Sequence, residues 1–199
     1  MKRLLLLTLL LAVVALVVVA GYLRATGLSA RPKPGSVETF VALKTRAFAI
    51  PATSREAQNP VLLNAQALPD AMHHYADHCA TCHANDGSGD TPLGRGLYPR
   101  PPDLRRPATQ NLTDGEMYWV IRNGVRFTGM PAFGDEKLGM QDEDSWKLVH
   151  FIRHLPKITD EELQAMKGFN PVSRAELEQE EQIRKFLAGE DTPIVEHKH

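Results

Sequence analysis

Two cysteines three positions apart, followed at once by a histidine, constrain this chain more than any other feature. The run is Cys79-Ala80-Thr81-Cys82-His83, and the chain contains no other cysteine. On one helical turn, positions 79 and 82 face the same side, so both sulfurs can bond to one planar group. A histidine in the next position can turn its imidazole toward a metal at the centre of that group. C-x-x-C-H is the attachment signature of c-type haem, so the pattern predicts one covalently bound haem c.

A redox dithiol, a zinc site and a disulfide framework each fit the cysteine pair less well than haem attachment does. A thioredoxin-like redox pair lies where a strand meets a helix in an alternating α/β pattern, and the sequence has no such pattern. A structural zinc site needs two further ligands at suitable spacing, and there is no second cysteine pair. Two cysteines are also too few for a disulfide framework.

Three segments resemble the class I cytochromes c, and they occur in the family's order. Residues 75–83 resemble the N-terminal helix, with an aromatic residue four positions before the first haem cysteine. The segment Gly129–Phe133 is similar to the loop that supplies the sixth iron ligand, and Trp146–Pro156 resembles the closing helix. The resemblance covers about residues 70–156. It implies an all-α, class I cytochrome c-like haem domain of three to four short helices that transfers single electrons.

Met130 is the predicted second axial ligand, with His83 as the first. A thioether is a soft ligand that favours Fe(II) and raises the reduction potential. Met130 lies between Gly129 and Pro131, and such residues let a backbone approach a haem and fix the direction of the sulfur. The residues alone leave Met140 as the alternative, whereas the resemblance places Met130 at the family's ligand position.

The stretch from Ala84 to Asn111 is rich in Gly and Pro, so it is expected to be irregular and to wrap one haem edge. In the family, a proline carbonyl in this loop accepts a hydrogen bond from the proximal histidine. The resemblance therefore implies that Pro102 accepts from His83, with Pro99 and Pro101 as competing positions. The candidate donors to the haem propionates are Arg95, Tyr98, Arg100, Arg105, Trp119 and Arg122.

The N-terminus has the character of a membrane segment. Residues 4–23 carry no charge, while Lys2 and Arg3 precede them and Arg24 follows. A spanning helix needs about 20 apolar residues and a signal-peptide core only about 7–15. Residues 1–23 are therefore predicted to be a retained anchor, with a cleaved signal peptide as the alternative. Because positive charge keeps its flank cytoplasmic, we expect a bacterial inner-membrane protein with its haem domain in the periplasm.

Residues 24–69 are predicted to form a Pro-containing periplasmic linker. Two alternatives stay open for it: a tether that lets the domain swing between partners, or a strap packed on the domain. Within it, residues 37–50 could form an extended segment or a short helix.

The haem domain, residues 70–156, is predicted to contain three principal helices. They cover residues 70–81, 113–122 and 142–155. Asp70 is the expected N-cap of the first, and a capping box opens the second at Thr113. The resemblance implies that the first and third helices cross, with Tyr75 near Trp146 and Phe151.

Residues 157–199 are predicted to be a helical C-terminal extension with a His-containing tail. Capping boxes at Thr159 and Ser173 predict helices at residues 160–167 and 174–188. The extension could pack on the domain or bind a partner. His197 and His199 form a weak metal-binding pattern. The helical pairs His74 with His78, and His150 with His154, are expected to be ordinary surface residues.

The chain has a formal net charge of −1 at pH 7, so it lacks the excess of basic residues that is typical of nucleic-acid-binding proteins. No catalytic constellation is found, so the chain is predicted to be an electron carrier rather than an enzyme. Its expected partners are a redox donor and acceptor, or a larger oxidoreductase subunit. The alternatives are a cytochrome subunit of a dehydrogenase or reductase complex and, less favoured, a haem-based sensor or peroxidase with an open sixth position.

Overall fold

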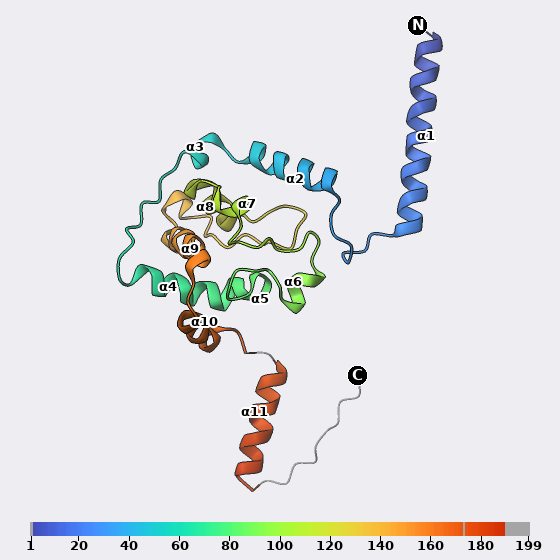
Figure 1. Ribbon diagram of the computed structural model, residues 1–199. Coiled ribbons are helices and arrows are strands. Elements are labelled where there is room, and N and C mark those ends of the chain that lie inside the picture. Colours follow the sequence, from blue (N-terminus) through green and yellow to red (C-terminus); the bar gives the residue numbers. More distant parts are fainter. Residues whose placement is uncertain (1, 173, 190–199) are drawn as a thin grey trace.

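Helices supply all the regular secondary structure in the described part of the chain. The computed structural model describes residues 2–172 and 174–189, and no strand occurs among them. Figure 1 shows a central group of short helices with α1 (Lys2–Thr26) and α11 (Arg174–Leu187) projecting from it. The prediction of an all-α fold is confirmed.

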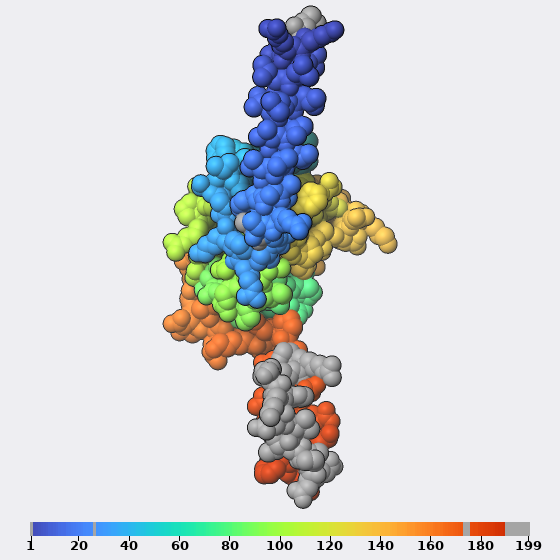
Figure 2. All heavy atoms as spheres, turned by 90° about the vertical axis from the view of Figure 1, so that its right-hand side faces the viewer, coloured from blue at the N-terminus to red at the C-terminus, as the bar shows by residue number. Residues whose placement is uncertain are grey.

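Helix α1 is long enough and apolar enough to cross a bilayer. Its side chains lie exposed to solvent, including large apolar residues such as Leu4, Leu11 and Val18. Figure 1 shows this helix apart from the domain, and Figure 2 shows its N-terminal part rising above it. An apolar surface of this length is stable only inside a membrane or against a partner.

The core of the domain is built from crossing helices. The first helical segment consists of α4 (Ala67–His74), a π-helical turn (Tyr75–Cys79) and α5 (Ala80–His83). Helix α9 (Glu143–His154) packs across α4, and α8 (Asp114–Asn123) packs against α9. Tyr75 meets Phe151 at 4.9 Å between ring centroids, as expected. Trp146 stacks instead on Tyr118, at 4.0 Å and 17°.

Local signals fix the starts of α8 and α9. Thr113 Oγ1 accepts from the backbone N–H of Glu116, while the Glu116 carboxylate accepts from the Thr113 N–H, completing the capping box. Asp142 caps α9 by accepting from the Ser145 N–H at 3.2 Å. These two predicted helix starts are confirmed.

The predicted start of the first helix at Asp70 is wrong. The helix begins at Ala67, because the Asn64 side chain accepts from the backbone N–H groups of Gln66 and Ala67. Pro69 then falls in the first turn, where its missing N–H leaves no intrahelical bond unmade.

The stretch from Ala84 to Asn111 is not wholly irregular, and that prediction is wrong in part. It contains two single-turn helices, α6 (Pro92–Gly96) and α7 (Pro107–Gln110). Each begins with a proline, which suits the first helical position. Thr91 caps α6 by accepting from the Gly94 N–H at 2.8 Å. Three-ten turns cover Gly139–Gln141, Leu155–Lys157 and Lys167–Phe169.

The segment before the domain carries α2 (Ser36–Ala49) and α3 (Ala52–Arg55), together called the strap. It packs on the domain through α3, which contacts α8, whereas no residue of α2 is buried. Ile50, between the two helices, is only 2% exposed. Thr113 Oγ1 donates to the Arg55 carbonyl at 2.8 Å. A Cβ at Gly115 would lie 1.8 Å from the Ser54 carbonyl oxygen, so only glycine allows α3 to approach α8 this closely.

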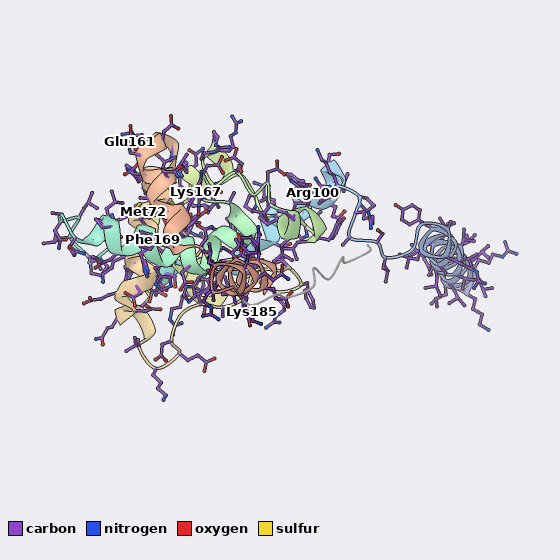
Figure 3. All side chains as sticks on the ribbon, turned by 90° about the horizontal axis from the view of Figure 1, so that it is seen from below. Met72, Arg100, Glu161, Lys167, Phe169 and Lys185 are labelled. Carbon is purple, nitrogen blue, oxygen red and sulfur yellow. The ribbon has the colours of Figure 1, made fainter. Side chains whose placement is uncertain are left out.

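The segment after the domain, residues 159–170, is called the arm and carries α10 (Asp160–Met166). Met166 is completely buried in the domain core. Phe169 meets the His73 ring at 4.6 Å, and Figure 3 shows Phe169 beside Met72 on α4. The arm therefore packs on the domain, whereas Figures 1 and 2 show α11 projecting beyond it.

Candidate haem site

A deep cavity lies among the helices of the domain, with an empty volume of about 1200 Å³ including its mouth. Its walls come from the first helical segment, the loop 97–104, α8, the loop 125–133 and α9. Most of the lining side chains are apolar, among them Leu97, Leu104, Leu112, Val120, Ile121 and Ile152. A wall of this kind suits a large flat apolar group and keeps water out.

One wall of the cavity carries Cys79, Cys82 and His83. The π-helical turn, which ends at Cys79, carries an extra residue, and such turns are common at functional sites. Tyr75 Oη donates to the Ala84 carbonyl at 3.0 Å and closes the end of this segment. Both thiols are free. Burial raises the pKa of the Cys79 thiol to about 12, which is the reverse of a reactive redox dithiol.

His83 is held in the cavity wall beside Pro102. Burial lowers the pKa of His83, and a backbone approach by Pro102 acts in the opposite direction. Since proline has no N–H, the Pro102 group that faces the imidazole is its carbonyl. The Nδ1 atom of His83 is buried and makes no hydrogen bond with the described residues. The Pro102 carbonyl is therefore close to the imidazole without accepting a hydrogen bond from it. Pro99 and Pro101 also line the cavity.

Met130 reaches the same cavity from the loop between α8 and α9. Its backbone is fixed on both sides, because its N–H donates to Thr128 Oγ1 at 3.1 Å and its carbonyl accepts from the Val125 N–H at 3.1 Å. A Cβ at Gly124, where φ is +66°, would lie 2.7 Å from the Met130 carbonyl oxygen. A Cβ at Gly129 would meet only the end of the Leu97 side chain, at 2.8 Å, so the close approach of this loop depends chiefly on Gly124.

Met140 lies outside this cavity, on a separate groove beside Trp146. Its carbonyl accepts from Trp146 Nε1 at 3.0 Å, and its side chain is 45% exposed. Met117 does line the cavity, from α8. The structure thus brings Met130, and not Met140, together with His83.

A comparison with known protein families bears on the same part of the chain. The family model described as "Cytochrome C oxidase, cbb3-type, subunit III" matches residues 66–152. Residues 66–152 are a class I c-type cytochrome domain. No curated protein matches the chain. The match supports haem binding and a part in electron transport for residues 66–152, called the cytochrome domain.

The residues around the cavity of the cytochrome domain fit a haem. Two thiols and an imidazole occupy one wall, a thioether reaches the cavity from another segment, and apolar side chains supply most of the remaining surface. The buried Nδ1 of His83 lacks a full hydrogen bond, as expected of an imidazole whose final orientation depends on a metal bound at its other nitrogen.

Four of the six predicted propionate donors have protein partners instead: Arg95, Tyr98, Arg105 and Arg122, whose Nη2 donates to the carbonyls of Asp135 and Glu136. Arg95 pairs with Asp90 at 2.6 Å, and Arg105 pairs with Asp103 at 2.8 Å. Tyr98 Oη donates to Glu38 Oε1 at 2.6 Å. Arg100 does line the cavity, and Figure 3 shows it at the α6 end of the domain, away from Glu161 and Lys167.

Sequence reasoning missed one cavity residue, Arg46 of α2. It lies 20 residues before the matched segment, in a stretch predicted to be a linker, so its place at the cavity depends on how the strap docks on the domain.

The other histidines of the cytochrome domain behave as surface or structural residues. His74 and His78 lie 4.8 Å apart between ring centroids, and burial lowers the pKa of His74. His150 bonds to the Val61 carbonyl at 2.7 Å, and His154 to Glu162 at 2.9 Å. Within the described residues, no group of three or more His, Cys, Asp or Glu side chains could hold a metal ion. His197 and His199 lie outside the described residues.

Proposed function

We propose that the chain is a membrane-anchored single-electron carrier with one haem c, attached through Cys79 and Cys82 and ligated by His83 and Met130. The observation that carries this proposal is the gathering of these four side chains at one apolar cavity, although Met130 lies far from the others in sequence. The family match over residues 66–152 supports haem-based electron transfer.

Bound haem supplies an iron that cycles between Fe(III) and Fe(II). The chain's residues do the rest. Cys79 and Cys82 fix the group in one orientation, and the Pro102 carbonyl directs the imidazole of His83. The thioether of Met130 is soft, so it favours the reduced state and raises the potential. The apolar wall would keep water away from the bound group, and Met130, as the second iron ligand, would leave no position open to oxygen or peroxide.

We propose that residues 1–23 are the anchor, residues 24–69 a linker on the periplasmic side, residues 70–156 the haem domain and residues 157–199 its extension. Support comes from α1, with Lys2 and Arg3 on its N-terminal flank. In bacterial spheroplasts, protease added from outside should degrade the cytochrome domain; survival of that domain until lysis would contradict a periplasmic location.

The haem proposal is tested on protein matured in a periplasm competent for c-type assembly. The red pigment should stay with the polypeptide through acid-acetone extraction, and its loss would show that the haem is not covalently bound. Met130→Ala should abolish the sulfur-to-iron charge-transfer band of the oxidised protein and lower the reduction potential. Met140→Ala is the matched control and should change neither. A band retained in Met130→Ala would reject Met130 as a ligand.

A second candidate function is a cytochrome subunit of a terminal oxidase. The description of the matching family, a subunit of a cbb3-type oxidase, favours it. Solubilisation in mild detergent separates the two candidates, since a carrier should migrate alone and a subunit should travel with a larger oxidoreductase. A native oxidised protein without the methionine band would favour a sensor or peroxidase instead.

A further inference from the structure

Arg46 belongs to the strap and yet lines the cavity of the cytochrome domain. It precedes residues 66–152, so no feature of the matched segment supplies it. Its Nε atom is buried and has no hydrogen-bond partner among the described residues. A charged N–H group in this position strongly favours an acceptor that enters the cavity.

The charge of the cavity wall points to the kind of acceptor. Arg46 and Arg100 both line the cavity, and none of its lining residues in the described part of the chain is Asp or Glu. A guanidinium is always protonated and matches a carboxylate through paired N–H···O bonds. Haem carries two carboxylates, its propionates, and these need counter-charges when they are shielded from water.

The strap is held in place at both ends of α2. At its C-terminal end Ile50 is buried, and just beyond it the Arg55 carbonyl accepts a hydrogen bond from Thr113 Oγ1 of the domain at 2.8 Å. Toward its N-terminal end, Tyr98 Oη donates to Glu38 Oε1 at 2.6 Å. Arg46 is thus held over the cavity by contacts on each side of it.

We propose that Arg46 binds a haem propionate and makes the strap a working part of the haem site. The inference rests on the proposed function, a haem c in this cavity. By pairing with the propionate, Arg46 leaves less negative charge beside the iron. Its loss therefore stabilises Fe(III) and lowers the reduction potential.

The test compares three full-length variants carrying covalent haem: Arg46→Gln, Arg46→Lys and Lys44→Gln. Lys44 is the matched control because it lies on the same helix, is exposed and is not among the cavity-lining residues. We expect Arg46→Gln to raise the oxidised-to-reduced ratio at fixed potential about tenfold, or about 59 mV for one electron. It should also speed amide hydrogen exchange in α2. Arg46→Lys should recover part of both effects, and Lys44→Gln should show neither.

Three results would overturn the inference while leaving haem attachment intact: no change in Arg46→Gln, an equal shift in Lys44→Gln, or faster exchange of α2 at an unchanged potential. If Arg46→Gln does not acquire haem, the inference is tested on the wild-type protein by NMR. Its ¹⁵N-labelled arginine spectrum should contain one slowly exchanging Nε–H signal that shifts between oxidation states and is lost in Arg46→Lys. Absence of that signal rejects the proposal. A wild-type protein without covalent haem would instead reject the proposed function.

Discussion

The strap and the arm flank the matched segment on opposite sides in sequence, and both pack on the same domain. The strap buries Ile50 between its helices, presses α3 against α8 and places Arg46 at the cavity. The arm buries Met166 in the hydrophobic core, and no residue of the arm lines the cavity. The two additions thus differ in the surface they reach: the strap reaches the site, whereas the arm reaches the core.

This difference separates two ways in which an extension can affect a small haem domain. A side chain buried in the core contributes to the free energy of unfolding and leaves the site's charge unchanged. A charged side chain over the cavity contributes little apolar burial but changes the electrostatics of the site. Variants of the arm should therefore change stability without changing the potential, while variants of the strap should change both.

The largest expected loss of stability comes from Met166→Ala. The side chain is completely buried, and truncation of a core methionine costs about 2–5 kcal/mol of unfolding free energy. Urea unfolding of the haem-containing protein measures this loss, and its spectrum and potential should match the wild type. Leu177→Ala, at an exposed position of α11, is the control and should stay within about 0.5 kcal/mol. A shifted potential in Met166→Ala would break the distinction between arm and strap.

Gly115→Ala tests the strap with a smaller effect. A helical Gly→Ala exchange would by itself gain up to about 1 kcal/mol. Here the new Cβ would lie 1.8 Å from the Ser54 carbonyl oxygen, and overpacking of this kind costs about 1–3 kcal/mol. We expect α3 to move off α8, faster amide exchange around Ile50, and a lower potential as Arg46 is withdrawn.

Gly96→Ala is the matched control for Gly115→Ala, because a Cβ at Gly96 meets no atom within 4 Å. A Gly115→Ala protein whose strap exchanges as slowly as the wild type would show that the close contact with Ser54 does not hold the strap.

Local sequence signals predicted much of this domain. The capping box at Thr113 acts within one helical turn, so it can be recognised without knowledge of the tertiary structure. The C-x-x-C-H run and the Gly129-Met130-Pro131 segment were recognisable for the same reason. The structure brings them to one cavity.

Features that depend on distant partners were not predictable. Trp146 stacks on Tyr118 rather than Tyr75, which only the packing of α8 on α9 decides. The burial of Met166 depends on how the arm folds back. Arg46 lines the cavity because α3 docks on α8. The local sequence feature that permits this docking is Gly115, which has no side chain to separate the two helices. A helix start with a capping box, such as that at Thr113, can be recognised in the sequence, whereas the start at Ala67 and the partner of each helix face were not.

Glu162→Gln tests how the arm is held, with a modest effect that depends on pH. Burial disfavours the Glu162 charge, but hydrogen bonds from His154 and Thr159 outweigh it and hold the pKa of Glu162 below its ordinary value of 4.5. A carboxyl group whose pKa is lowered by folding stabilises the folded state at pH values above its pKa in the unfolded chain. That stabilisation is lost as the pH falls through its pKa in the folded state. We expect a loss of about 0.5–1 kcal/mol near neutral pH.

Since glutamine can still accept the Thr159 N–H bond, the Glu162→Gln exchange isolates the charge. Urea unfolding as a function of pH should show the variant and the wild type converging at acid pH, below 4.5. A constant difference across that range would mean that shape, and not charge, holds the arm at this point.

The smallest effect is expected from Tyr98→Phe, which removes the hydrogen bond from Tyr98 to Glu38 at the N-terminal part of the strap. The bond lies at the surface, where water replaces a lost partner, so global stability should stay unchanged. Amide exchange should speed up only in the first turns of α2, because Ile50 and α3 still hold the other end. The potential should move less than in Arg46→Gln, since the guanidinium stays over the cavity. An equal shift in both variants would mean that the strap docks through Tyr98, and that Arg46 only follows.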